Sequence, residues 1–245
     1  MKLRLDKLLL ARGLVPSRER AQALILAGKV LVNEQKVEKP GTSVSTEAGI
    51  RLLGEDLRYV SRGGLKLEKA LEHWKIDVAG KTCVDVGAST GGFTDCLLQH
   101  GAARVVAIDT GRGQIDIKLR NDSRVRLLEQ TNARYLTAEE LEETADFLAM
   151  DVAFISATLV LPAMIAAAKP REIVVLVKPQ FEVGRERVGA GGIVRDESDQ
   201  QAAVSKVREA VAALGARDIE VIDSPITGSE GNREFLLHVR FHEKS

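Results

Sequence analysis

The sequence predicts an α/β protein: a doubly wound, mostly parallel sheet of seven strands, preceded by a small α+β domain. Three observations support this fold class. A strand, a glycine-rich turn and the start of a helix follow one another at residues 82–98. Strand-like and helix-like apolar patterns then alternate as far as residue 241, as in a parallel sheet covered by helices. Residues 1–42 are basic and instead show two short helices and a hairpin.

Composition limits the class of protein further. The chain has 245 residues, 44% hydrophobic and 29% charged, enough for one full-sized domain and a smaller companion. Apolar stretches such as 155–168 are too short to span a bilayer, and the N-terminus has no signal-peptide cleavage pattern. We therefore expect a cytoplasmic protein that needs no membrane. The two cysteines, Cys83 and Cys96, lack the spacing of zinc ligands, so we expect them to be buried and reduced, and we expect no metal site.

The N-terminal segment carries an excess of positive charge. Residues 1–42 contain nine Lys or Arg and four Asp or Glu, a net charge of +5 that the rest of the chain offsets. We expect a short amphipathic helix from the leucines at 3–9 and a second helix from its Ser17 cap to Gly28. A hairpin with its turn at 33–34 follows. The charge alone fits either a solvated surface or a nucleic-acid-binding face.

The stretch RLDKLLLARGLVPSRERAQALILAGKVLVNEQKVEKPGTSV, residues 4–44, resembles the S4-type RNA-binding domain along its whole length. In that family the second helix and the hairpin meet RNA, which implies phosphate or shape contacts. The residues so implied, with their basic neighbours on the first helix, are Arg4, Lys7, Arg18, Arg20, Lys29, Asn33 and Lys36. A strand at 50–53 and an exposed turn at 54–56 complete the domain. We place this domain at residues 1–58, a linker at 59–62 and a second domain at 63–245.

The glycine-rich turn at residues 87–92 is the predicted ligand site of the second domain. Glycines at such a turn let the backbone approach a ligand and point free N–H groups at it. The alternative is a turn between strand and helix that needs glycines for its backbone geometry and binds no ligand. Asp109 ends the next strand, 24 residues after Asp85, where a carboxylate can bind a ribose diol. Ser89 stands where a dinucleotide-binding turn has its second glycine, which leaves less room for a diphosphate.

The segment VDVGASTGGFT, residues 84–94, resembles motif one of the class I (Rossmann-like) methyltransferases, which bind S-adenosylmethionine. On that resemblance the turn flanks the amino-acid part and the sulfonium, Asp109 holds the ribose, and Asn132 lies near the adenine. A plain turn residue is the alternative for Asn132. The residues implied in cofactor binding are Asp85, Gly87, Ala88, Ser89, Thr90, Gly91, Gly92, Phe93, Thr94, Asp109, Asn132 and Asp151.

Four charged residues indicate the reaction. Asp151 ends the fourth strand, Lys178 ends the fifth, and Glu234 begins the last. Strand-end positions place these three over one edge of the sheet, and Lys66 lies on a helix that we expect to start at Ser61. Each has an ordinary alternative role as a cap or surface charge. Together they resemble the Lys-Asp-Lys-Glu tetrad of FtsJ-like ribose 2′-O-methyltransferases. We expect Lys178 to activate the hydroxyl, and Asp151 and Glu234 to keep the cluster near neutral and to orient Lys178 and Lys66.

Four motifs extend the resemblance over nearly the whole chain, to the TlyA family, also called hemolysin A: VSRGGLKL, DVGASTGGFT, LVKPQFEVG and GAGGIVRD. The family implies 2′-O-methylation of cytidine in large-subunit ribosomal RNA, with ribosomal RNA or ribosomal subunits as partners. Its longer members also modify the small subunit. This chain resembles the shorter form, so activity on the small subunit is a secondary expectation.

Three alternatives compete with this assignment. A ribosome-assembly protein could bind RNA without catalysis, and a membrane-lytic protein would need an exposed amphipathic or spanning segment. A pseudouridine synthase also pairs this RNA-binding domain with a catalytic one, but the tripeptide Arg4-Leu5-Asp6 falls inside the first small helix, too early for its catalytic motif. The long loop at 180–196 lies beside the predicted site. We expect it to close over RNA or cofactor, with Arg185 and Arg187 near phosphate.

Overall fold

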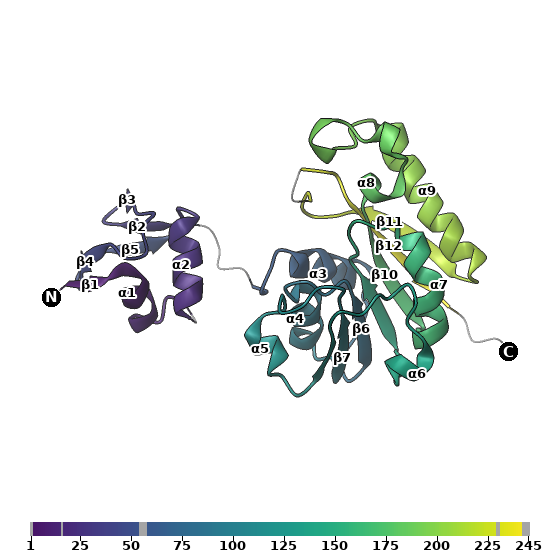
Figure 1. Ribbon diagram of the computed structural model, residues 1–245, viewed down its shortest axis with the longest axis horizontal. Helices are drawn as coiled ribbons and strands as arrows, with labels where there is room; N and C mark the ends of the chain where they lie inside the picture. The colour runs from purple at the N-terminus through teal and green to yellow at the C-terminus, as the bar shows by residue number, and fades with distance from the viewer. Residues whose placement is uncertain (1, 16, 54–57, 229–230, 242–245) are drawn as a thin grey trace. The chain divides into compact units, whose positions relative to one another are not determined.

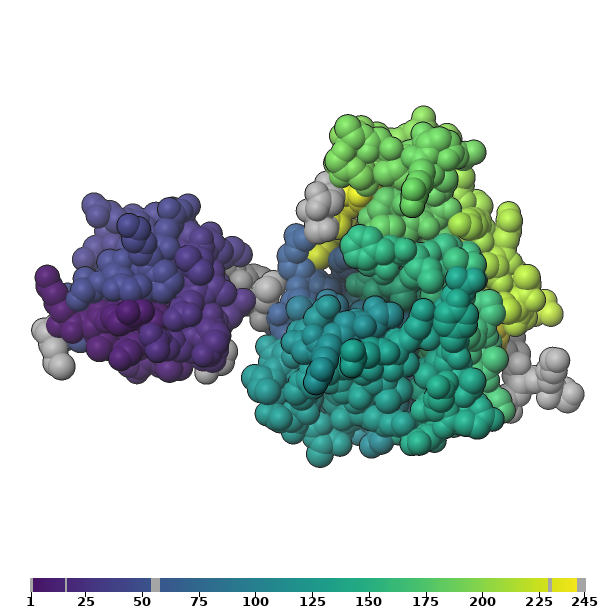
Figure 2. Space-filling model, in the orientation of Figure 1, coloured from purple at the N-terminus to yellow at the C-terminus, as the bar shows by residue number. Residues whose placement is uncertain are grey.

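The computed structural model describes residues 2–15, 17–53, 58–228 and 231–241. The chain divides into two compact units, Met1–Asp56 and Leu57–Ser245 (Figures 1 and 2). Each has its own buried hydrophobic core. None of the described helices is long and apolar enough to cross a membrane.

The first unit contains two helices and two small sheets. The helices are α1 (Leu5–Ala11) and α2 (Arg18–Leu26), and the strands are β1 (Lys2–Arg4), β2 (Val30–Val32), β3 (Gln35–Lys36), β4 (Ser43–Ser45) and β5 (Ile50–Leu52). The sheets have the orders β1-β4 and β3-β2-β5. Leu5, Leu9, Ile25 and Val30 are fully buried between them. The Ser17 side chain accepts a hydrogen bond from the Arg20 amide, which confirms the predicted cap of α2.

The expected first helix begins later than the leucine pattern indicated. Residues 2–4 instead form β1, which pairs antiparallel with β4. The predicted hairpin is confirmed: its two turn residues, Asn33 and Glu34, have φ angles of 49° and 64°, as two-residue hairpin turns require. The predicted turn at 54–56 lies outside the described residues.

The expected linker at 59–62 belongs to the second unit. Tyr59 is 2% exposed there, and its hydroxyl donates a hydrogen bond to Glu68 on the following helix, α3 (Gly63–Trp74). A Cβ atom at Gly64 would lie 2.2 Å from the Tyr59 ring. The absence of a side chain at Gly64 thus lets the aromatic ring pack directly against the helix.

The second unit is built on one sheet with the strand order β11-β12-β10-β9-β6-β7-β8 (Figure 1). The strands are β6 (Thr82–Val86), β7 (Arg104–Ile108), β8 (Val125–Leu128), β9 (Phe147–Met150), β10 (Glu172–Val177), β11 (Arg217–Asp223) and β12 (Phe235–Arg240). Five neighbouring strands, in the order β8, β7, β6, β9 and β10, pair in parallel. Strand β12 runs antiparallel to both of its neighbours, β10 and β11. This confirms the predicted doubly wound, mostly parallel sheet of seven strands.

Helices cover both faces of this sheet (Figure 1). Besides α3 they are α4 (Gly92–Gln99), α5 (Ile117–Arg120), α6 (Ala138–Leu141), α7 (Ala157–Ala168), α8 (Pro179–Glu182) and α9 (Glu197–Ala213). Along β6, Val84 and Val86 pack in the cluster that contains α7 and α9, whereas Cys83 packs in the cluster that contains α3 and α4. Burial on both faces explains why central strands such as β9 and β10 are nearly continuous apolar runs. The strand order reverses between β6 and β9, and such sheets bind ligands at the carboxyl ends of the strands at this point.

Candidate active site

The turn after β6 allows three elements to meet at the end of the sheet. Gly87 has a φ angle of +87°, and a Cβ atom there would lie 2.4 Å from the carbonyl oxygen of Asp151, which follows β9. A Cβ atom at Gly92 would lie 2.3 Å from the Ser61 hydroxyl oxygen, just before α3. These two glycines therefore bring the end of β9 and the start of α3 against the turn.

A cavity of about 540 Å³ opens beside the turn. All four predicted catalytic residues line it. Its lining is formed by Val60, Ser61, Arg62, Gly63, Lys66, Gly87, Ala88, Ser89, Thr90, Gly92, Phe93, Asp151, Lys178 and Glu234. Residues from α3, from the ends of three strands and from the turn thus line the same cavity. The strand-end positions of Asp151, Lys178 and Glu234 predicted that these three would lie together.

The four charged residues form two ion pairs. Lys66 Nζ lies 2.5 Å from Glu234 Oε2, and their side chains are 10% and 3% exposed. Lys178 Nζ lies 2.5 Å from Asp151 Oδ1, and their side chains are 13% and 20% exposed. An unpaired charge would be costly at such burial, so each carboxylate fixes the position of one ammonium group. The cluster as a whole has no net charge.

A second cavity, of about 360 Å³, shares Gly87, Ser89 and Asp151 with the first. Asp109 lines it from the end of β7, and its two oxygens accept hydrogen bonds from the Ser89 amide at 2.8 Å and the Gly111 amide at 2.7 Å. Among the described residues that line this cavity, the charged ones are Asp109 and Asp151. Such a lining suits a ligand with hydroxyl groups and a positive charge and disfavours a diphosphate.

Asn132 also lines the second cavity, and its place beside the adenine stays a prediction. Its side chain oxygen accepts a hydrogen bond from the Arg134 amide at 3.1 Å, so it shapes a turn as well. Three of the predicted cofactor residues, Asp85, Gly91 and Thr94, are not part of either lining.

Asp85 supports the turn from beneath. Its side chain is fully buried, and its Oδ2 accepts hydrogen bonds from the Thr94 amide at 2.9 Å and the Thr94 hydroxyl at 2.6 Å. Its Oδ1 has no hydrogen-bond partner within the described part of the chain. Burial raises the pKa of Asp85 to about 7. The carboxyl group therefore changes from protonated to ionised near neutral pH.

The segment after Lys178 is more structured than the predicted loop at 180–196. It forms α8 and then two short 3₁₀ turns at Arg185–Arg187 and Ala190–Gly192. Asn232, which is 1% exposed, donates a hydrogen bond to the Gly192 carbonyl at 2.8 Å and accepts one from the Val194 amide at 3.0 Å. The sequence analysis did not single out Asn232, although it lies two residues before Glu234. It ties this segment to the edge of the first cavity.

The predicted RNA-binding residues occupy several environments. Arg4 and Arg18 both pair with Asp6. Lys36 pairs with Glu38 at 2.8 Å, and the Asn33 side chain accepts a hydrogen bond from the Gly49 amide. Lys7, Lys29 and Arg185 are exposed, Arg20 is partly buried, and Arg187 pairs with Asp199 at 3.2 Å. Arg4, Lys7 and Arg18 are the three that the structure brings together around one side chain.

Both cysteines are buried and free, as predicted.

Comparisons with known proteins agree with this architecture. A family model described as "FtsJ-like methyltransferase" matches residues 59–241, and the model of the S4 domain matches residues 3–50. The "16S/23S rRNA (cytidine-2'-O)-methyltransferase TlyA" of Mycobacterium tuberculosis is 46% identical over 239 residues, covering 97% of this chain and 89% of that protein. "Hemolysin A" of Brachyspira hyodysenteriae is 41% identical over 238 residues, covering 96% and 99%.

Solved structures show the same likeness. The "Putative hemolysin from Streptococcus thermophilus" superposes with a TM-score of 0.77 at 43% identity, covering 99% of this chain and 90% of that one. The "putative S-adenosylmethionine dependent methyltransferase from Listeria monocytogenes" shares the fold, with a TM-score of 0.54 at 16% identity over 75% of this chain and all of that one. With the tetrad, the turn and both family models on the same chain, the protein is an enzyme of the FtsJ-like methyltransferase family that carries an S4 domain ahead of its catalytic domain.

Proposed function

We propose that the protein methylates the ribose 2′-hydroxyl of cytidine in ribosomal RNA, using S-adenosylmethionine, with large-subunit RNA as the main substrate and small-subunit RNA as a secondary one. The observation that supports this most strongly is the shared lining of the two cavities, which sets two Lys–carboxylate pairs beside an acidic ligand site. The Mycobacterium tuberculosis relative is named for cytidine 2′-O-methylation of ribosomal RNA, and the S4 domain supports an RNA substrate. A cytoplasmic location fits such a substrate.

The described residues fit S-adenosylmethionine, which would supply an electrophilic methyl group. Asp109 would accept hydrogen bonds from the ribose diol, since each of its oxygens has capacity beyond its one backbone bond. Asn132 would lie beside the adenine, and the turn at 87–90 would hold the amino-acid part. The negative charges of Asp109 and Asp151 would favour a sulfonium over a phosphorylated cofactor.

The two ion pairs provide what methylation of a hydroxyl needs. A ribose 2′-hydroxyl is a poor nucleophile at neutral pH, so its proton must leave as the oxygen gains the methyl group. Lys178 would first release one proton of its ammonium group to water, and its neutral Nζ, in a position that Asp151 fixes, would then accept the proton of the hydroxyl. Lys66, held by Glu234, would orient the ribose for attack. General-base catalysis contributes about 10² to 10⁴-fold in rate, and positioning adds to it.

Methyl transfer to separated ribosomal subunits tests the proposal. The protein and S-adenosylmethionine with a labelled methyl group are incubated with each subunit, and the modified nucleotide is mapped. We expect label on the 2′-oxygen of a cytidine in the large subunit. Lys178→Ala should lose at least about 100-fold in rate, while calorimetry shows retained cofactor binding.

Two results would contradict the proposal in different ways. Binding of ribosomal RNA without transfer of label would favour the non-catalytic assembly protein. Transfer at the normal rate by Lys178→Ala would retain the enzyme but remove Lys178 from its mechanism. Lys69→Ala is the matched control, because Lys69 is an exposed lysine of α3.

A further inference from the structure

We propose that Asp6 is a positioning residue for RNA binding: its buried carboxylate holds the guanidinium groups of Arg4 and Arg18 side by side as a preformed site for backbone phosphate. This inference rests on the proposed RNA substrate. It assigns a role in RNA binding to a negatively charged residue, although RNA-binding surfaces are expected to be positively charged.

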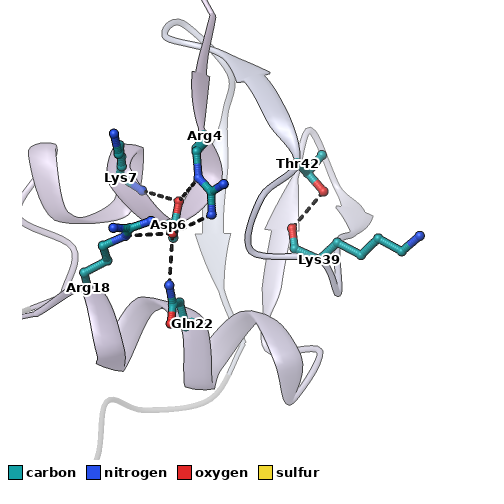
Figure 3. Close-up of polar contacts among 7 residues, drawn as sticks. All are labelled: Arg4, Asp6, Lys7, Arg18, Gln22, Lys39 and Thr42. Carbon is teal, nitrogen blue, oxygen red and sulfur yellow. Dashed lines mark hydrogen bonds and ion pairs between the residues drawn. The ribbon is translucent and has the colours of Figure 1, made fainter.

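The Asp6 carboxylate is the centre of a hydrogen-bonded cluster (Figure 3). It is 0% exposed. Its Oδ1 accepts hydrogen bonds from Arg4 Nε at 3.1 Å and from the Lys7 amide at 3.0 Å. Its Oδ2 accepts from Arg4 Nη2 at 3.1 Å, from Arg18 Nε at 2.9 Å and from Gln22 Nε2 at 3.2 Å. One side chain thus joins residues of β1, α1 and α2.

The two arginines remain accessible although they are paired. Their side chains are 47% and 43% exposed. Asp6 binds the Nε of each and one terminal nitrogen of Arg4; as far as the described residues go, Arg4 Nη1 and both terminal nitrogens of Arg18 remain for a ligand. Gly41 lies beside Arg4 Nη1, where a Cβ atom would be at an ordinary contact distance of 3.4 Å. Two guanidinium forks next to each other suit the oxygens of a phosphate.

The carboxylate explains how the two cations can stay together. Without it, adjacent guanidinium groups would repel each other, and each long side chain would sample many rotamers. With it, the pair keeps a net charge of +1 and a fixed geometry, so less conformational entropy is lost when RNA binds. The Arg4 hydrogen bonds hold the pKa of Asp6 far below its usual range, which keeps the carboxylate charged.

The substitution Asp6→Asn separates positioning from simple charge. Removing a negative charge makes the first unit more basic, so charge alone predicts tighter RNA binding. Positioning predicts the opposite: we expect the Kd for large-subunit ribosomal RNA to rise about tenfold, and the slope of log Kd against log salt to fall by about 1. In methyl transfer, KM for RNA should rise while kcat and cofactor affinity stay unchanged.

Two further variants complete the test, and all three variants are made in the full-length protein. Glu19→Gln is the matched control, because it removes an exposed carboxylate next to Arg18 on α2 and should bind RNA as tightly as the wild type or slightly more tightly. Arg18→Lys keeps the charge but loses the fork, and it should bind more weakly even if Asp6→Asn fails to fold.

Each result bears on the inference. Binding by Asp6→Asn as tight as by Glu19→Gln, or a lower melting temperature with an unchanged salt slope, would overturn it, as would full affinity in Arg18→Lys. Failure of the wild type to bind any ribosomal RNA would instead overturn the proposed function.

Discussion

Replacing Asp85 with asparagine should remove a pH-dependent loss of stability from the second unit. Burial raises the pKa of this carboxyl from 3.8 to about 7. As pH rises above 3.8, the unfolded chain releases the proton while the folded protein retains it, so the free energy of unfolding falls as pH rises through this window. The slope approaches 1.4 kcal/mol per pH unit. Between pH 5 and pH 7 the wild type should lose about 2 kcal/mol that Asp85→Asn does not lose.

Urea unfolding at several pH values measures this difference. Trp74, the only tryptophan, lies on α3 and is 9% exposed, so its fluorescence reports on the second unit. The amide oxygen of the substituted side chain can still accept both hydrogen bonds from Thr94. Glu209→Gln, at an exposed position of α9, should follow the wild type at each pH. Equal pH slopes for the wild type and Asp85→Asn would refute the reasoning.

Three further substitutions test the site. Lys66→Ala should lower the methyl-transfer rate by at least about 100-fold, because it leaves the buried Glu234 unpaired, whereas Lys69→Ala should retain full activity in the same assay. Gly87→Ala should weaken binding of S-adenosylmethionine at least about tenfold in calorimetry, a cost of about 1.4 kcal/mol, since its Cβ would lie 2.4 Å from the Asp151 carbonyl oxygen; an unchanged affinity would show that the turn can relax. Asn232→Ala should make trypsin cleave faster after Arg187 and Arg195, because Gly192 and Val194 lose their anchor, and digestion at the wild-type rate would mean that other contacts hold the segment.

The parts of the fold that could be predicted are those whose sequence reflects burial. The central strands of the second unit are apolar on both faces, as Val84 and Cys83 illustrate on β6, so their order along the chain could be predicted. Strands β1 and β4 were missed because each has three residues of which one is apolar, Leu3 and Val44 respectively, which is too little for a strand pattern. They form because they pair with each other. The start of α3 differed by two residues, because it was expected at Ser61 and lies at Gly63, as is usual at helix ends.

The candidate site divides in the same way. The rule that ligands bind at strand ends predicted that Asp151 and Lys178 would meet. It could not predict how the lysines pair, since Lys66 and Glu234 are 168 residues apart. Asn232 was not predicted, because its partners are backbone atoms 38 and 40 residues away. Any residue type has these backbone atoms, so the sequence does not indicate which ones will bind Asn232.

The distribution of charge separates substrate binding from chemistry. In the first cavity each lysine of the tetrad is neutralised by a carboxylate within 2.5 Å, so the tetrad gives a polyanion little net attraction. The second cavity carries two carboxylates and would repel phosphate. Besides Arg62 in the first cavity, residues 1–42, with a net charge of +5, hold the largest positive surplus identified. On the proposed function, the paired lysines would then act on a single hydroxyl, while the basic segment would supply most of the attraction for RNA.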